Sequence, residues 1–131
     1  MGQSDKSTRG RQTTKALGDA AENQALDYLV AQGLTLVGRN YRTPGRGGGE
    51  IDLIMRDTDG TVAFVEVRLR SQAQYGGALG SITVTKQRRI VWAARHFLSR
   101  LPKLPPCRFD VVVIEQDGRA QWLQAAFEAS A

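Results

Sequence analysis

The sequence predicts an α/β fold, with a mixed central β-sheet of about five strands flanked by helices. Two segments carry apolar residues at helical spacing, and five short segments have the apolar, β-branched composition of strands. Glycine and proline separate these segments. A chain of 131 residues is long enough for one domain with a real core and too short for two.

Helices are expected at 15–32 and 83–100. Gly33 is a stop signal for the first, and Pro102 ends the second because proline cannot continue a helix. The apolar residues that recur at helical spacing in the first are Leu17, Ala21, Ala25, Tyr28 and Leu29. The core face expected for the second consists of Ile90, Ala94, Phe97, Leu98 and Leu101.

The strands are expected at 34–41, 50–56, 61–70, 108–115 and 121–123. A glycine-rich segment, 43–49, separates the first two, and we expect it to be a flexible loop because glycine does not favour regular structure. It is either a substrate-contacting loop or a plain connector. An Asp-Gly pair at 117–118 is typical of the turn that would join the last two strands.

The first 14 residues are polar, with scattered basic residues, and predict a disordered basic tail before a single domain over 15–131. This tail lacks the apolar stretch of a secretory signal, and no apolar run is long enough to span a bilayer. Cys107 is the only cysteine, which excludes an intramolecular disulfide. We therefore expect a cytoplasmic protein.

The strands at 50–56 and 61–70 predict an antiparallel hairpin. Their apolar faces coincide only if the loop has an odd number of residues, and the three residues 58–60 satisfy this, with Gly60 in the left-handed conformation. The predicted cross-strand pairs on the apolar face are Ile51 with Val67, Leu53 with Val65, and Met55 with Ala63.

On the other face of this hairpin Asp52 lies across from Glu66, and Glu50 across from Arg68. Opposed side chains have Cβ atoms about 4.5–5.5 Å apart, so two carboxylates there need a shared proton or a cation. One cysteine and one histidine cannot form a zinc site, which leaves an oxygen-bound ion, Mg²⁺ or Mn²⁺. If the face is exposed, the same residues are ordinary surface carboxylates and Glu50–Arg68 is a weak ion pair.

Six runs of residues, in order along the chain, resemble the YraN-like family of small uncharacterised bacterial proteins. The runs are GDAAENQALDYLVAQG, GRNYR, GEIDLI, FVEVR, VTKQRRI and CRFDVVVI, within roughly residues 15 to 127. The resemblance implies a restriction-endonuclease-like or Holliday-junction-resolvase-like fold. It also implies a metal-dependent endonuclease acting on structured DNA, with a nuclease signature of Asp followed later by Glu-x-Lys.

Carried onto this chain, the resemblance makes Asp52 and Glu66 the metal-binding carboxylates and the Val67 carbonyl a third oxygen ligand. It makes Glu22 the additional acidic residue that some relatives bring to the site from the first helix. On a helical wheel Glu22 lies at the edge of the buried arc, a position that also fits an exposed flanking residue. Asp110 either lies near this site or is a surface residue of its strand.

The chain departs from the family pattern at Arg68, where Glu-x-Lys has its lysine. Arginine stays protonated and cannot act as a base, although it can bind a phosphate or stabilise transition-state charge. Lys86 is a possible substitute cation; it also fits a phosphate-contacting or solvated helix residue. Two functions therefore stay open: a nuclease weakened by Arg68, and a non-catalytic nucleic-acid-binding module.

The formal net charge is +5, and no Asp or Glu occurs between Ser71 and Phe109. Such a stretch favours a polyanion, in particular DNA, over a membrane surface; an adaptor for an acidic protein is the remaining alternative. Relatives that resolve junctions act as dimers, so a homodimer is plausible. Trp92 is expected in the core or at its edge. The basic residues of the stretch are Lys86, Arg88, Arg89, Arg95, Arg100, Lys103 and Arg108. The predicted nucleic-acid-binding residues are Arg46, Lys86, Arg88, Arg89 and Arg95.

Overall fold

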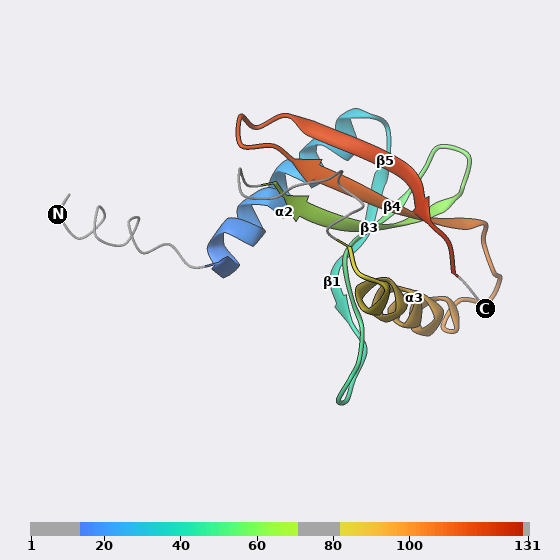
Figure 1. Cartoon of the computed structure of the whole chain (residues 1–131). Coiled ribbons are helices and arrows are strands. Elements are labelled where there is room, and N and C mark those ends of the chain that lie inside the picture. The colour runs from blue at the N-terminus through green and yellow to red at the C-terminus, as the bar shows by residue number, and fades with distance from the viewer. Residues whose placement is uncertain (1–13, 71–81, 130–131) are drawn as a thin grey trace, which may run out of the picture.

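A computed structural model describes residues 14–70 and 82–129 (Figure 1). Every predicted helix and strand within these ranges is present. The elements are α2 (Thr14–Ala31), β1 (Thr35–Arg42), β2 (Glu50–Arg56), β3 (Val62–Leu69), α3 (Val84–Leu98), β4 (Cys107–Ile114) and β5 (Ala120–Phe127). The predicted basic tail, apart from its last residue, and the segment 71–81 lie outside the described residues.

The five strands form one sheet in the order β1-β2-β3-β4-β5. Neighbouring strands are antiparallel except β3 and β4, which are parallel. A parallel pair needs a crossover connection, and α3 lies in that connection. The mixed five-stranded sheet flanked by two helices confirms the predicted fold class and is consistent with a restriction-endonuclease-like core.

Each helix packs on its own face of the sheet, because alternate residues of a strand point to opposite faces. The cluster on the α2 face contains Ala21, Ala25, Leu29, Leu53, Met55, Ala63, Val65, Val112 and Ile114. The cluster on the α3 face contains Ile51, Ile54, Val62, Phe64, Ile90, Ala93, Ala94 and Phe109. The central strands are therefore apolar on both faces. Neither α2 nor α3, the helices of the described ranges, is long and apolar enough to cross a membrane.

Glycines with positive φ end α2 and close two turns, as the sequence predicted. Gly33 has φ +101°, and beyond it the Leu34 amide donates to the Leu29 carbonyl, which caps the helix. The β2–β3 loop has the predicted three residues, because the Asp57 amide donates to the Thr61 carbonyl and Gly60 has φ +89°. The β4–β5 turn repeats this arrangement, with Gly118 at φ +90°.

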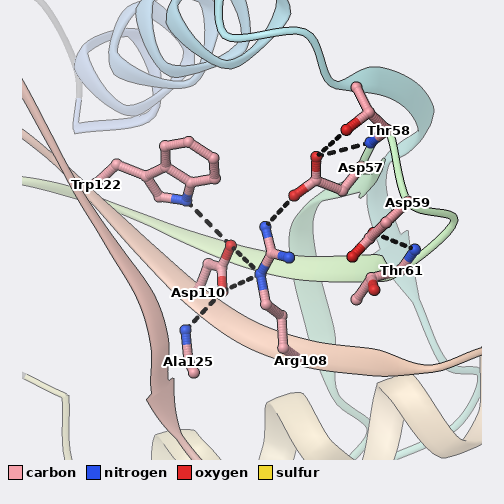
Figure 2. A network of polar contacts seen from close by, with 8 residues as sticks. All are labelled: Asp57, Thr58, Asp59, Thr61, Arg108, Asp110, Trp122 and Ala125. Carbon is pink, nitrogen blue, oxygen red and sulfur yellow. Dashed lines mark hydrogen bonds and ion pairs between the residues drawn. The ribbon is translucent and has the colours of Figure 1, made fainter.

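A buried polar network joins the β2–β3 turn to β4 and β5 (Figure 2). Asp110 is fully buried, and Arg108 Nε donates to both of its carboxylate oxygens at 3.1 and 3.0 Å. Trp122 Nε1 and the Ala125 amide donate to the same carboxylate, and Arg108 Nη2 donates to Asp57 Oδ2 at 2.9 Å. Asp110 thus has a structural role, and its full burial excludes the surface position that was one of the two alternatives for it.

The strand β5 is longer than the predicted 121–123, extending to Phe127. Its pairing with β4 shifts register between Phe109 and Val111, and Ala125 has φ +50° there. The shift breaks the alternation of buried and exposed residues along β5. The two-residue period by which a strand is recognised in a sequence is therefore lost in its second half. The bulge is held by the hydrogen bond from the Ala125 amide to Asp110.

Candidate functional site

The hydrogen-bonded ladder between the central strands β2 and β3 ends next to Asp52, where the two strands diverge. Their ladder pairs Arg56 with Val62, Met55 with Ala63, Ile54 with Phe64 and Leu53 with Val65. Past this point the Val67 amide donates to Asp52 Oδ2 at 2.8 Å, in place of the predicted Ile51–Val67 strand pair. Ile51 also packs on the α3 face and not, as predicted, with Leu53 and Met55, because the regular ladder ends between them. The Asp52 side chain therefore lies in the opening between the strands.

Glu66 of β3 lies on the α3 side of the sheet and is only 3% exposed. Two cations approach its Oε2: Arg68 Nη1 at 3.4 Å and Lys86 Nζ at 3.6 Å. Lys86 is in the first turn of α3, where its amide donates to the Thr83 side chain that caps the helix. The cap orients this first turn, so the lysine at its third position reaches the buried carboxylate.

Burial makes both carboxylates costly to ionise, and the Asp52 charge adds to the cost for Glu66. Burial raises the pKa of Glu66 to about 7, with the Asp52 charge as the next cause, while Lys86 and Arg68 act in the opposite direction. Burial likewise raises the pKa of Asp52, opposed first by the hydrogen bond from the Val67 amide. The alternative of exposed surface carboxylates does not describe this pair.

Glu22 of α2 approaches the same group of carboxylates from the other helix. Its side chain is 12% exposed, and Oε1 is buried without a hydrogen bond within the described ranges, 3.7 Å from Arg39 Nη2. Burial raises the pKa of Glu22, and the Asp52 charge is the next cause. Glu22 is half-buried, at the edge of the buried arc, and its carboxylate is close enough to Asp52 for the two charges to interact.

Arg39 is a site residue that the sequence did not reveal. It comes from β1 opposite Leu53, after a register shift between Leu36 and Gly38. Its guanidinium also donates to the Asn23 side chain at 2.9 Å. Alternation along the strand would not identify it, because the shift changes which residues face α2.

A hollow of about 370 Å³ opens beside Glu22, between α2 and the β1–β2 hairpin. Glu50 lines it and pairs with Arg42 across the hairpin at 3.5 Å. The complete lining is Lys15, Gly18, Asp19, Glu22, Asn40, Arg42 and Glu50. The hollow gives a small polar or charged ligand access to the Glu22 side of the carboxylate group.

The glycine-rich loop before β2 is shaped by two close contacts. Thr43 Oγ1 accepts a hydrogen bond from the Gly49 amide at 2.7 Å, and the Thr43 amide donates to the Gly49 carbonyl. A Cβ on Gly49 would lie 1.9 Å from the Arg89 carbonyl oxygen of α3. Any side chain at position 49 would collide with α3, so glycine is required where the chain enters β2. This steric requirement adds to the flexibility that was predicted for the loop.

The predicted nucleic-acid-binding residues separate into two groups. Arg88, Arg89 and Arg95 are exposed on α3, and Arg46 is exposed in the loop at the end of the β1–β2 hairpin. Lys86 instead turns toward Glu66. Of the wider basic stretch, Arg108 is turned inward to Asp57 and Asp110, so it adds nothing to a basic surface.

The carboxylates fit a hard divalent cation by their chemistry. No group of three or more His, Cys, Asp or Glu side chains in the described ranges is arranged to hold a metal ion by itself. Mg²⁺, however, commonly uses one or two carboxylates and completes its shell with water and substrate phosphates. Asp52 and Glu66 supply two such ligands, and the Glu22 carboxylate, whose Oε1 lies 3.7 Å from Arg39 Nη2, adds negative potential.

These features define a small α/β protein with a buried carboxylate site where two central strands diverge. A family model described as "Uncharacterised protein family UPF0102" matches residues 21–114, and the chain belongs to this family. It is 68% identical over 117 residues to a UPF0102 protein of Albidiferax ferrireducens, covering 89% of this chain and 91% of the relative. A UPF0102 protein of Paracidovorax citrulli is 59% identical over 135 residues, covering 98% and 99%. The family resemblance seen in the sequence is confirmed.

Proposed function

We propose that the protein is a metal-dependent endonuclease-like protein that acts on structured DNA in the cytoplasm. The observation that carries the proposal is the Asp52–Glu66 pair. Both carboxylates have raised pKa values, and Lys86 of α3 lies 3.6 Å from Glu66 Oε2. Burying such a pair costs stability unless a cation is bound, and that cost supports a functional role.

Asp52 and Glu66 would hold Mg²⁺ or Mn²⁺, with the Val67 carbonyl as a further oxygen ligand. When bound, such an ion supplies Lewis acidity and a water molecule of lowered pKa. The Val67 amide orients Asp52 through its 2.8 Å hydrogen bond. Glu22, with its raised pKa, can hold or accept a proton on the hollow side of the site.

The basic side chains near the carboxylates would have separate roles. Arg68 stays protonated, so it would bind a phosphate oxygen of the scissile group. Lys86 lies 3.6 Å from Glu66 Oε2 and takes the place of the lysine in the Glu-x-Lys pattern. Its ammonium can orient a water molecule or stabilise charge on the phosphate. Arg46, Arg88, Arg89 and Arg95 would hold the flanking phosphates.

One observation favours a non-catalytic nucleic-acid-binding module of the same fold. Two cations already neutralise Glu66, at 3.4 and 3.6 Å, so the pair has partial charge compensation without a metal. In this second function the fold and the basic surface are kept, and the carboxylates contribute to structure alone.

Cleavage of labelled branched and linear DNA with Mn²⁺ or Mg²⁺ separates the two functions. The proteins compared are the wild type, Asp52→Ala, Glu66→Ala and Arg68→Lys, with Asp117→Ala as an exposed-carboxylate control. We expect cleavage that both site alanine variants abolish, that Arg68→Lys increases and that the control leaves unchanged. Absence of cleavage in every protein, together with salt-sensitive DNA binding unaffected by Asp52→Ala, supports the binding module. Sedimentation of the same samples tests the homodimer expected from the sequence.

A further inference from the structure

The outer face of α3 carries an exposed tryptophan. Trp92 is 59% exposed, and Val84, two turns earlier on the same face, is 60% exposed. Tryptophan is highly buried on average in folded proteins, so a large exposed indole is informative. This contradicts the expectation that Trp92 lies in the core or at its edge. The inner face of the helix is filled by Ile90, Ala93 and Ala94, which leaves the indole no position toward the sheet.

Two arginines flank Trp92 on the same strip of the helix. Arg88 precedes it by four residues and Arg95 follows it by three, and residues at these spacings are neighbours on a helix surface. Within the described ranges no carboxylate pairs with either guanidinium, unlike Arg39, Arg68 and Arg108. Their charge is therefore available to a ligand.

A hollow of about 360 Å³ lies against this strip, between α3 and the end of β5. Val84 and Val91 provide apolar lining beside Trp92, and Arg88 and Arg95 provide positive charge. Glu128 lines the β5 side, and its carboxylate repels an anion there. The hollow therefore combines a flat aromatic surface with a positive margin along the helix and a negative margin opposite.

We propose that this face binds an unpaired nucleotide of a single-stranded nucleic acid, with the base stacked on Trp92 and the adjacent phosphates at Arg88 and Arg95. Every base has a π-face, and an aromatic side chain beside basic residues is the arrangement that single-strand-binding surfaces share. A second copy of this chain would bring the same arginines face to face, and its net charge of +5 opposes that contact.

The inference deepens the proposed function by naming the substrate class, and in that respect rests on it. Trp92 lies six residues after Lys86, about 9 Å along the helix axis. Lys86 faces the carboxylate site and Trp92 faces solvent on the same helix. A single strand stacked on Trp92 would reach the Glu66 side of the helix by passing around the first turn of α3, which carries Lys86. The substrate is accordingly DNA with an unpaired stretch, such as a branch, flap or overhang.

The test measures binding in metal-free buffer with a chelator, so that it does not depend on cleavage. The wild type, Trp92→Ala, Trp92→Phe and Arg88→Gln/Arg95→Gln are titrated with oligothymidylate, oligouridylate and a blunt DNA duplex of equal length. Leu104→Ala, which alters an exposed leucine (77%) in the α3–β4 connection, is the matched control. Circular dichroism confirms that each variant is folded.

We expect Trp92→Ala to weaken single-strand binding about tenfold, Trp92→Phe to weaken it less, and the duplex affinity to change little. The double arginine variant should lower the salt dependence of single-strand binding by roughly one to two charges. Quenching of tryptophan fluorescence by the single strand should disappear in Trp92→Phe, which retains Trp122. Comparison of the two oligonucleotides shows whether DNA or RNA is preferred.

Unchanged single-strand affinity in folded Trp92→Ala overturns the proposal. So does a variant that dissociates a dimer without affecting nucleic-acid binding, because the face is then an interface between copies. Failure of the proposed function has a different signature: Asp52→Ala and Glu66→Ala would lack any effect on cleavage while Trp92→Ala still loses single-strand affinity.

Discussion

Lys86 Nζ of α3 lies 3.6 Å from Glu66 Oε2 of β3. In the Glu-x-Lys pattern the lysine follows its glutamate on the same strand, a position that Arg68 occupies here. The lysine ammonium thus comes from a helix instead of the strand, and Arg68 remains beside the same carboxylate oxygen at 3.4 Å. Relative to the Glu-x-Lys pattern, arginine therefore stands at the strand position and lysine on the helix. Mutagenesis of the two residues can test this arrangement directly.

If Lys86 replaces the strand lysine, Lys86→Gln should reduce DNA cleavage by about a hundredfold or more while single-strand affinity changes little. The reason is that loss of a group that stabilises charge in the transition state typically costs about this factor. Arg68→Lys in the Lys86→Gln background should restore part of the rate. Single-turnover cleavage measures both effects. Lys103→Gln, at an exposed residue of the α3–β4 connection, is the control, and an equal loss of rate there would contradict a special role for Lys86.

The raised pKa of Glu66 predicts that the metal-free protein loses stability as the pH rises. Its folded pKa is about 7, against an ordinary value of 4.5, so between these values the folded state binds more protons than the unfolded state. Stability contributed by the protonated form is present below pH 4.5 and is lost as the pH passes through 7, a change on the order of 3 kcal/mol. Asp52, whose pKa is also raised, acts in the same direction.

Urea unfolding at a series of pH values measures this slope. Glu66→Gln, which cannot ionise, should give a flatter profile between about pH 5 and pH 7. A wild-type profile that rises over the same interval would show that Lys86 and Arg68 compensate the Glu66 charge in full.

Metal binding should reverse the cost of burying the carboxylates. We expect Mn²⁺ at a hundredfold excess over its Kd to raise the wild-type Tm by about 5–10 °C. Asp52→Asn should abolish that increase and, in the metal-free protein at neutral pH, should itself raise the Tm because one of two repelling charges is removed. Asp59→Asn, in the exposed β2–β3 turn, is the control. Equal metal-induced shifts in the wild type and Asp52→Asn would place the ion elsewhere.

The carboxylate pair could be predicted because it depends on local periodicity. Alternation along β2 and β3 determines which residues share a face, and the three-residue loop with Gly60 determines the register. Asp52 and Glu66 follow from these two facts. The prediction for Ile51 was wrong, because its side chain lies on the opposite face of the sheet from Leu53. The change of face occurs where the β2–β3 ladder ends, and the two-residue alternation of a strand cannot show where a ladder ends.

The contributions from outside the hairpin depend on packing between distant segments. Arg39 reaches Glu22 only after the register shift in β1. The prediction for Trp92 was wrong, because an aromatic residue in an amphipathic helix is ordinarily assigned to the core or its edge and this one is exposed. Charge counting along the chain likewise treated Arg108 as part of the basic surface, although it is paired with Asp110 and Asp57.

The Asp110 network should be the most sensitive polar group in the fold. Asp110→Ala removes the acceptor of Arg108, of the Trp122 indole N–H and of the Ala125 amide at once, and all three donors lie in partly buried surroundings. Breaking a buried pair by removing one partner costs roughly 3–5 kcal/mol, because the other charge is left uncompensated. We expect a loss of this size in urea unfolding, together with a change in the near-ultraviolet signal of Trp122.

The matched control for this prediction is Asp117→Ala, which removes the exposed carboxylate that pairs with Arg119 at 2.7 Å. The sequence separation is the same, two residues in each pair, but the Asp117 pair is in solvent and should contribute almost nothing. Similar losses in the two variants would mean that the network stabilises through local strand geometry, since burial would then make no difference. A large loss in Asp110→Ala alone would identify the buried network as the anchor of the β5 bulge.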